Sequence, residues 1–244
     1  MDWYVGCSGF QYKEWKGIFY PEGMPQRKWL EYYCDHFDTL ELNVTFYRFP
    51  QLSFLESWYN RSPDEFRFSV KVPRTITHYQ HFINSEPLLN EFYALLSKGL
   101  SDKLGPVLFQ LPPKYQYTPE RLQQILQIMD TDFENVIEFR HSGWWCPEVT
   151  EALTQKNITF CGASYPGLPE DTIVNAPVVY YRFHGIPKLY YSPYSENALQ
   201  KVADAIQQQS RSVQKAYLYF NNTANASAIE NATVIKKYIN SFSG

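Results

Sequence analysis

Charged side chains interrupt stretches of this sequence that otherwise read as buried β-strands. In NVIEFRH, residues 135–141, Glu138 and Arg140 alternate with Ile137 and Phe139. Successive side chains of a strand point to opposite faces, so the two charged groups share one face and the two apolar groups share the other. A charge that is buried without a partner costs several kcal/mol. These groups must therefore pair with each other, with water or with a ligand.

The same alternation recurs in other strand-like stretches, always toward the C-terminal end of the stretch. The polar residues that it places on the charged face are Glu41, Asn43, Lys71, Gln110, Arg182, His184 and Asn221. Lys71, Arg140 and Arg182 are cationic, whereas only Glu41 and Glu138 are anionic, so the cluster carries a slight positive excess. Because arginine matches phosphate and carboxylate groups, we expect a pocket for a small anion. The alternative is a purely structural network of salt bridges.

Three members of this face are candidates for catalytic groups. His184 stands before Gly185 at the end of its strand and could serve as a general acid or base, or could only bond a neighbouring strand. Glu41 and Glu138 are the candidate carboxyl groups. A glycosidase pair is disfavoured, because the two glutamates come from strands on nearly opposite sides of the expected sheet. No clustered metal-ligand motif is present, and we expect neither a metal nor a cofactor.

Binding roles are assigned to the remaining polar residues and to aromatic residues of the following loops. Lys71, Arg140 and Arg182 would hold the anion, and Asn43, Gln110 and Asn221 would supply amide groups. Trp144 and Trp145 open the loop after the fifth strand, and Phe46 and Tyr47 open the loop after the second. Such aromatic residues could stack on a sugar or a base. The alternative for such an aromatic residue is a buried anchor for its loop, which we favour for at least one tryptophan of the Trp144–Trp145 pair.

Strands and helices alternate along the whole chain. Strands are expected at 3–9, 39–43, 66–73, 106–112, 135–141, 158–164, 178–185 and 216–222, and helices at 26–36, 53–60, 86–98, 118–130, 147–156, 195–209 and 226–240. Parallel strands need such crossovers, so the pattern predicts an α/β fold, a single (β/α)8 TIM-type barrel with parallel strands. The gap between the sixth and seventh strands reads as a loop, so the sixth helix should be missing or shortened. An open doubly wound sheet is the main rival, but no GxGxxG follows the first strand.

Composition narrows the class of protein. The chain has 244 residues with 44% hydrophobic residues, which is typical of a globular protein, and we expect one domain over 1–244. The net charge of −3 argues against a protein whose main role is to grip long nucleic acids. No apolar run approaches the roughly 18 residues that span a bilayer. With no secretory signal and four scattered cysteines, a cytoplasmic location with free thiols is expected.

Several motifs together resemble the YecE-like family, the domain of unknown function 72. They are GCSGFQYKEWKGIFYPEG, LELNVTFYRFP, FSVKVPRTITH, FQLPP, EFRHSGWW, YYRFHG and YLYFNNT, and in this order they cover nearly the whole chain. The resemblance implies a TIM barrel, in agreement with the strand count, and implies no established activity. The chain departs from the family pattern at Phe10, where tryptophan is usual, and at Ser164, where an aspartate is frequent. A mechanism that needs that aspartate is therefore open to question for this chain.

Three functions follow from these observations. The first is an enzyme acting on a small anionic substrate, nucleotide-like in one version, at the C-terminal mouth of the barrel, where barrel enzymes place their sites. Fold alone does not give the reaction, although a hydrolase or lyase fits the lack of a cofactor motif. The second is a binder of single-stranded nucleic acid or nucleotides that uses the same cations and aromatic residues. The third is a protein-interaction module built on tyrosine-rich loops such as PKLYYSPYSE, residues 187–196.

Overall fold

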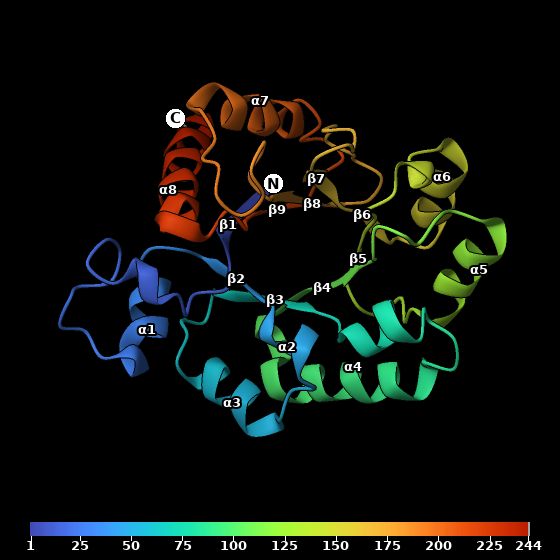
Figure 1. Cartoon of the computed structure of the whole chain (residues 1–244), viewed down its shortest axis with the longest axis horizontal. Coiled ribbons are helices and arrows are strands. Elements are labelled where there is room, and N and C mark those ends of the chain that lie inside the picture. Colours follow the sequence, from blue (N-terminus) through green and yellow to red (C-terminus); the bar gives the residue numbers. More distant parts are fainter. Residues whose placement is uncertain (244) are drawn as a thin grey trace.

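The computed structural model describes residues 1–243 and forms a nearly closed barrel of parallel strands surrounded by helices (Figure 1). The strands are β1 (Asp2–Ser8), β2 (Thr39–Leu42), β3 (Arg67–Lys71), β4 (Leu104–Gln110), β5 (Asn135–Glu138), β6 (Thr159–Phe160), β7 (Gly162–Ser164), β8 (Val178–Phe183) and β9 (Lys215–Phe220). They pair in the order β6-β5-β4-β3-β2-β1-β9-β8-β7. The predicted TIM-type barrel is confirmed, and the strands lie inside the predicted stretches except at three starts, where β1 and β9 begin one residue earlier and β4 begins two residues earlier.

The sixth predicted strand forms a seam in the barrel. It is divided at Cys161 into β6, which pairs with β5, and β7, which pairs with β8. Beside β6 the sheet is completed by a side chain. Asn175 Oδ1 accepts a hydrogen bond from Phe160 N at 2.8 Å, and Asn175 Nδ2 donates to Ile158 O at 2.9 Å. The amide of Asn175 therefore occupies the place where a neighbouring strand would pair.

Helices cover the outside of the sheet (Figure 1). They are α1 (Trp29–Cys34), α2 (Val44–Tyr47), α3 (Leu52–Asn60), α4 (Glu86–Leu100), α5 (Pro119–Ile128), α6 (Pro147–Gln155), α7 (Glu196–Gln207) and α8 (Ser227–Asn240). Seven match predicted segments within a few residues. The short helix α2 was not predicted. No helix lies among residues 165–177, as expected for the sixth crossover. None of the helices in the described part of the chain is long and apolar enough to cross a membrane.

Local sequence explains where the helices begin. Thr118 precedes α5, and its side chain accepts a hydrogen bond from the backbone N–H of Arg121. Pro119 follows at the first helical position, where its missing N–H costs nothing. Ser195 caps α7 in the same way through Ala198 N. These caps fix the start of helices whose apolar faces pack on the sheet.

Two apolar layers lie on the two sides of the sheet. The larger one packs the helices against the outer face of the strands. The smaller one fills the lower part of the lumen, and its buried members are Leu108, Val136, Cys161, Tyr180, Tyr217 and Tyr219. Tyrosine replaces the branched aliphatic residues that are usual inside such barrels. A buried phenol needs a polar partner, and the hydroxyl of Tyr180 finds one in Glu41, the first of the charged residues above this layer.

Candidate functional site at the mouth of the barrel

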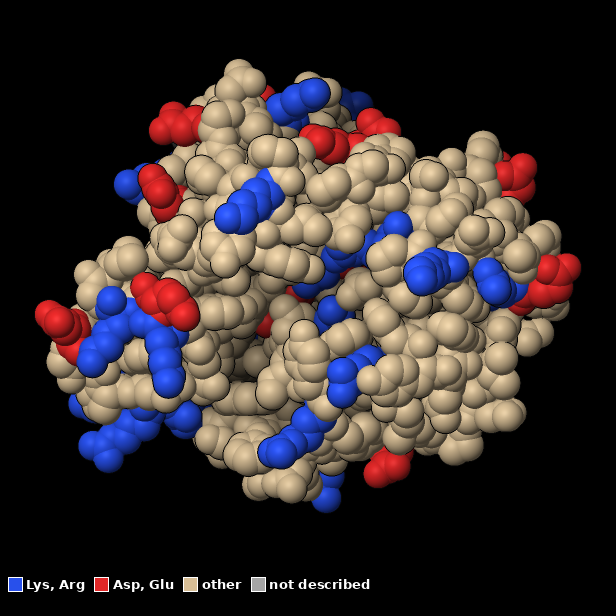
Figure 2. Space-filling view, in the orientation of Figure 1, with Lys and Arg blue, Asp and Glu red and all other residues tan. Residues whose placement is uncertain are grey.

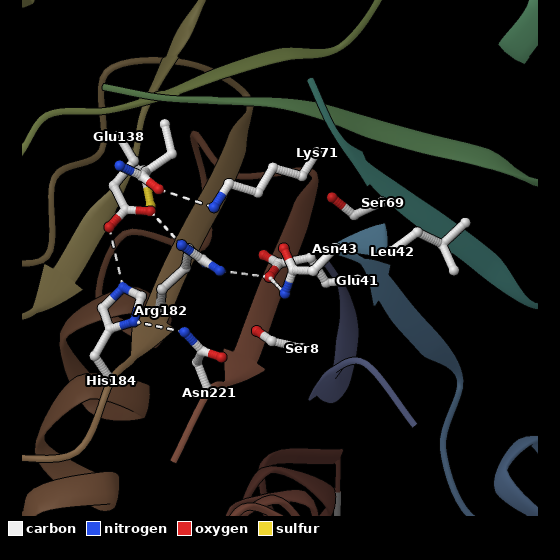
Figure 3. A network of polar contacts seen from close by, with 12 residues as sticks. Ser8, Glu41, Leu42, Asn43, Ser69, Lys71, Glu138, Arg182, His184 and Asn221 are labelled. Carbon is white, nitrogen blue, oxygen red and sulfur yellow. Dashed lines mark hydrogen bonds and ion pairs between the residues drawn. The ribbon is translucent and has the colours of Figure 1, made fainter. Parts of the chain in front are cut away.

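The C-terminal ends of the strands bring the predicted polar residues together (Figure 3). Glu41 comes from β2, Lys71 from β3, Glu138 from β5 and Arg182 from β8, and His184 follows β8 directly. All five side chains point into the lumen. The alternation of the strands therefore placed them on the correct face.

Arg182 is the centre of this group. Its Nη2 donates to Glu41 Oε1 at 2.6 Å, and its Nη1 donates to Glu138 Oε2 at 2.5 Å. Glu41 also accepts a hydrogen bond from the Tyr180 hydroxyl at 2.6 Å and one from Asn43 Nδ2 at 3.1 Å. One arginine of β8 thus bridges carboxylates of β2 and β5 across the lumen.

Glu138 connects Arg182 to a second arginine and to the histidine. Arg140 Nε lies 2.5 Å from Glu138 Oε1, and His184 Nε2 lies 3.0 Å from the same oxygen. Arg140 Nη2 lies 3.0 Å from His184 Nε2, and Asn221 Nδ2 lies 3.0 Å from His184 Nδ1. With the proton on Nε2, the neutral imidazole donates to Glu138 and accepts from Asn221, and it has no lone pair on Nε2 to accept from Arg140 Nη2. We name these five residues, Glu41, Glu138, Arg140, Arg182 and His184, the charged network.

The charges of this network set the protonation of its members. Burial alone would raise the pKa values of Glu41 and Glu138, but neighbouring arginines outweigh burial and lower both, that of Glu138 strongly. Burial lowers the pKa of His184 to about 3, helped by the charge of Arg140. Burial opposes the charge of Arg182, yet the two carboxylates raise its pKa well above the usual value. Near neutral pH the network holds two carboxylates, two guanidinium groups and a neutral imidazole.

Lys71 lies beside the network without an ion pair. Its Nζ donates to Gln110 Oε1 at 2.8 Å and lies 4.0 Å from the centroid of the Phe46 ring. Gln110 Nε2 donates to the carbonyl oxygen of Leu111 at 2.6 Å, which fixes the amide with its oxygen toward the lysine. Burial, followed by the charge of Arg182, lowers the pKa of Lys71 to about 7.

This geometry changes the expected charge of the pocket. The two carboxylates and two arginines of the charged network balance one another, and His184 is neutral. Any positive excess in the lumen therefore depends on Lys71, whose amine is only about half protonated near pH 7. The positive excess in the structure is smaller than the one predicted by counting residue types, because burial favours the neutral forms of histidine and lysine.

Solvent reaches only the upper edge of this group. Lys71 and Arg140 are 9% and 8% exposed, whereas Glu41, Glu138 and His184 are fully buried. Figure 2 shows Lys and Arg side chains around a hollow near the centre of this face, with acidic atoms visible inside it. A ligand that enters here meets Lys71 and Arg140 first. The proposed catalytic roles of the buried groups stay predictions.

The remaining predicted residues take different positions. Trp144 is fully buried, stacks on Phe139 and donates from Nε1 to the carbonyl oxygen of Tyr115 at 2.7 Å. The prediction that Trp144 contacts a ligand is therefore wrong in this structure, because its apolar ring and its one donor are both used to anchor the loop after β5. Tyr47 lies on α2 and is 68% exposed. With Gly9 and other residues it lines a groove of about 300 Å³ beside the mouth.

Two further aromatic residues border the cationic groups, Phe46, which was expected at the mouth beside Tyr47, and Tyr165, which sequence reasoning missed. Phe46 covers the amine of Lys71, and the ring of Tyr165 lies 4.0 Å from Arg140 Cζ. Both rings are half-buried and belong to segments that follow strands, α2 after β2 and the stretch after β7. The signal that could have found Tyr165 is an aromatic residue just beyond a strand end, as for Phe46 and Tyr47. Distance to a particular cation is not readable from that signal.

Fold and lumen define the chain as a TIM-type barrel with a charged network at its C-terminal mouth. A profile of the family described as "Protein of unknown function DUF72" matches residues 4–243, and the chain belongs to this family. The resemblance inferred from the motifs is thereby confirmed. The family description assigns no activity, substrate or pocket.

Relatives in two bacteria carry names of the same kind. UPF0759 protein YunF of Bacillus subtilis (strain 168) is 26% identical over 269 residues, which cover 93% of this chain and 91% of that protein. UPF0759 protein YecE of Escherichia coli (strain K12) is 31% identical over 141 residues, which cover 57% of this chain and 48% of that protein.

Solved structures agree with the barrel fold. A DUF72 family protein from Thermotoga maritima MSB8 has a TM-score of 0.89 and 28% identity, covering 98% of this chain and 100% of that chain. A DUF72 family protein from Enterococcus faecalis V583 has a TM-score of 0.84 and 20% identity, covering 98% of this chain and 95% of that chain. The second likeness shows the fold alone.

Proposed function

We propose that this protein is an enzyme that binds a small anionic substrate at the mouth of the barrel and uses the amine of Lys71 as a reacting group. The observation that carries the proposal is the state of this lysine. It is buried at the end of a barrel strand, forms no ion pair within residues 1–243 and faces a neutral amide. A lysine kept partly unprotonated near pH 7 is suited to accept a proton or to attack an electrophile.

Arg140 supplies the anion contact in this proposal. Its Nε and Nη2 face Glu138 and His184, whereas its Nη1 makes no hydrogen bond to any described residue. The guanidinium group is slightly exposed and lies against Tyr165. It can therefore offer one free donor edge to a carboxylate or phosphate without leaving the charged network.

Thermal shift with inorganic phosphate and a panel of phosphorylated and carboxylated metabolites tests the proposal. Ligands should raise the Tm of the wild type and of Lys201→Met, an exposed control on α7, and should lose most of this effect in Lys71→Met and Arg140→Met. Equal shifts in all four proteins, or no shift with any ligand in the wild type, would overturn the proposal.

One observation favours the nucleic-acid alternative. The Arg74 guanidinium lies 5.6 Å from the ring of Tyr47 and 5.3 Å from the ring of Tyr79, both of which are exposed. Such an arrangement can stack on unpaired bases. Binding of a labelled single-stranded oligonucleotide should then weaken steeply between low and moderate salt and in Arg74→Met. Salt-independent binding, or none, would remove this alternative.

A further inference from the structure

The amine of Lys71 has fewer hydrogen-bond acceptors around it than an ammonium group can use. An ammonium group carries three N–H donors, but Gln110 Oε1 is the one oxygen to which Nζ donates among the described residues. A neutral amine carries two N–H groups and a lone pair. Gln110 accepts one N–H, and the face of Phe46 can accept the other. With these two acceptors the ammonium leaves one N–H without a partner, whereas the neutral amine leaves none.

No described residue donates a hydrogen bond to Nζ. The amide of Gln110 is held with its oxygen toward the lysine, because its nitrogen bonds to Leu111 O. A neutral amine in this position has a lone pair that is not engaged by the protein, at an atom near the upper edge of the lumen. Such an amine is a nucleophile.

Charged groups on several elements face this lysine. They are Glu41 of β2, Glu138 of β5, Arg140 just after β5, Arg182 of β8 and His78 in the segment after β3. The carboxylates among them already pair with arginines, and none forms an ion pair with Lys71. The two arginines and the two carboxylates oppose one another, so burial of the amine, rather than the surrounding charge, is what chiefly supports its neutral form.

Two free polar groups accompany the amine. Arg140 Nη1 makes no hydrogen bond to a described residue, and Asn43 Oδ1 is buried without a hydrogen-bond partner in the described chain. The guanidinium edge suits an anionic group, and the amide oxygen suits a hydroxyl donor. A buried acceptor without a hydrogen-bond partner is destabilising until a partner arrives. These groups point to a substrate that carries more than an anion.

We propose that Lys71 forms an imine with the carbonyl carbon of a small aldehyde or ketone that also carries a carboxylate or phosphate, which Arg140 contacts. This inference rests on the proposed function and names the substrate class of the same site. Lys103, the other buried lysine among the described residues, donates to the carbonyl oxygens of Tyr59 and Ser62 and has no comparable freedom.

The step balances without a cofactor. The lone pair of Nζ attacks the carbonyl carbon, a C–N bond forms, and the π electrons move to the carbonyl oxygen. That oxygen leaves as water with the two hydrogens of the amine, and a C=N bond remains. Protonation of the nitrogen then makes the imine an acceptor for electrons from an adjacent C–H or C–C bond. No group is oxidised or reduced in the condensation.

Reductive trapping tests this step. The wild type is incubated at pH 7.5 with pyruvate or glyceraldehyde 3-phosphate, reduced with borohydride, and mapped by peptide mass spectrometry. We expect the adduct at Lys71 at least about tenfold above that at exposed Lys201, and its loss in Lys71→Met. Acetone, which lacks the anion, should label Lys71 no better than Lys201. Adducts spread over exposed lysines, with none at Lys71, would overturn the imine.

A second measurement is independent of the choice of substrate. Reductive methylation with formaldehyde and cyanoborohydride should modify Lys71 with a half-maximal rate near pH 7, whereas Lys201 should need a pH nearer 10. Phosphate binding that depends on Lys71 and Arg140, together with a Lys71 that is methylated near pH 7 but gives no trapped adduct, would overturn the imine and leave the proposed function standing. Loss of both phosphate binding and trapping would overturn both.

Discussion

Two lysines are buried at opposite ends of this barrel, and they are held in opposite ways. Lys103 stands just before β4, at the N-terminal end of the strands, and is 3% exposed. Its Nζ donates to Tyr59 O at 2.8 Å and to Ser62 O at 2.7 Å, and lies 3.8 Å from Asp64 Oδ1. Lys103 therefore has acceptors for most of its ammonium protons.

Lys71 ends β3 at the other end of the strands, where it has one neutral oxygen within hydrogen-bond distance. Both amines lie over an aromatic ring, at 4.0 Å from Phe46 for Lys71 and at 4.4 Å from Tyr59 for Lys103. The difference is therefore not burial or aromatic contact but the supply of oxygen acceptors. Lys103 has two carbonyl oxygens as acceptors and ties a loop to the barrel, whereas Lys71 has one amide oxygen, as the proposed reaction at Lys71 requires.

The largest effect that separates the two lysines should come from removing Lys103. Lys103→Met should lower the free energy of unfolding by about 3–5 kcal/mol, because two charge-assisted hydrogen bonds to partly buried carbonyl oxygens are lost. Urea unfolding followed by circular dichroism at pH 7 measures this change. A loss below about 1 kcal/mol would show that its acceptors contribute little and would weaken the contrast.

Lys71→Met should instead raise the free energy of unfolding near pH 7, and the size of this effect should depend on pH. The pKa of Lys71 is about 7 in the folded protein and about 10.4 in an unfolded chain, so between these values the unfolded chain binds more protons. Burial of the charged lysine therefore lowers the free energy of unfolding at or below pH 7, and this loss is recovered as the pH rises. Relative to Lys71→Met, the wild type should gain about 2 kcal/mol between pH 7 and pH 9.

Urea unfolding of both proteins at each pH isolates this difference, since groups other than Lys71 titrate in both. A constant difference across this range would mean that the folded lysine keeps its proton, and would remove the distinction from Lys103.

Gln110→Glu should make Lys71 resemble Lys103. A carboxylate at 110 would give the amine an ionic partner and should raise the pKa of Lys71 by about 1–2 units. The pH at which reductive methylation of Lys71 is half-maximal reports this shift. Gln110→Leu is the matched control, since it removes the acceptor without adding charge and should move the midpoint downward. The same midpoint in both variants would contradict the role of Gln110 as a positioning residue.

The smallest effect concerns the two aromatic rings. Tyr59→Leu should lower the free energy of unfolding slightly, and to a similar extent at pH 6 and pH 8, because the contact of its ring with Lys103 Nζ is lost. Phe46→Leu should cost more at pH 6 than at pH 8, because the amine of Lys71 loses its charge in between. Unfolding at the two pH values measures both changes. Equal pH dependence of the unfolding free energy in the two variants would contradict the expected difference between Lys71 and Lys103.

Alternation along the strands predicted much of this site. It placed Glu41, Lys71, Glu138 and Arg182 on the inner face, and the order of strands and helices predicted the barrel that brings them together. These inferences succeeded because they depend on local geometry. A strand has a period of two, and a parallel sheet needs crossovers, whatever the tertiary contacts are.

The pairing of charges was not predictable in this way. Arg182 binds Glu41 although the two residues are 141 positions apart in the sequence. The cation that is left without a carboxylate is decided by how far each side chain extends across the lumen. The isolation of Lys71 follows from a neutral residue at 110, and the burial of Trp144 from how its loop folds back on Tyr115. Protonation then follows from these contacts rather than from residue type.

The amide of Asn175 beside β6 has a consequence for how copies of this chain meet. A strand with free N–H and C=O groups along one side is a template for a strand of another molecule. Asn175 occupies both groups on that side, at Phe160 N and Ile158 O, with no helix over the crossover to shield them. One side chain thereby leaves neither group for a strand of another copy, and Asn175→Ala would leave both without a partner.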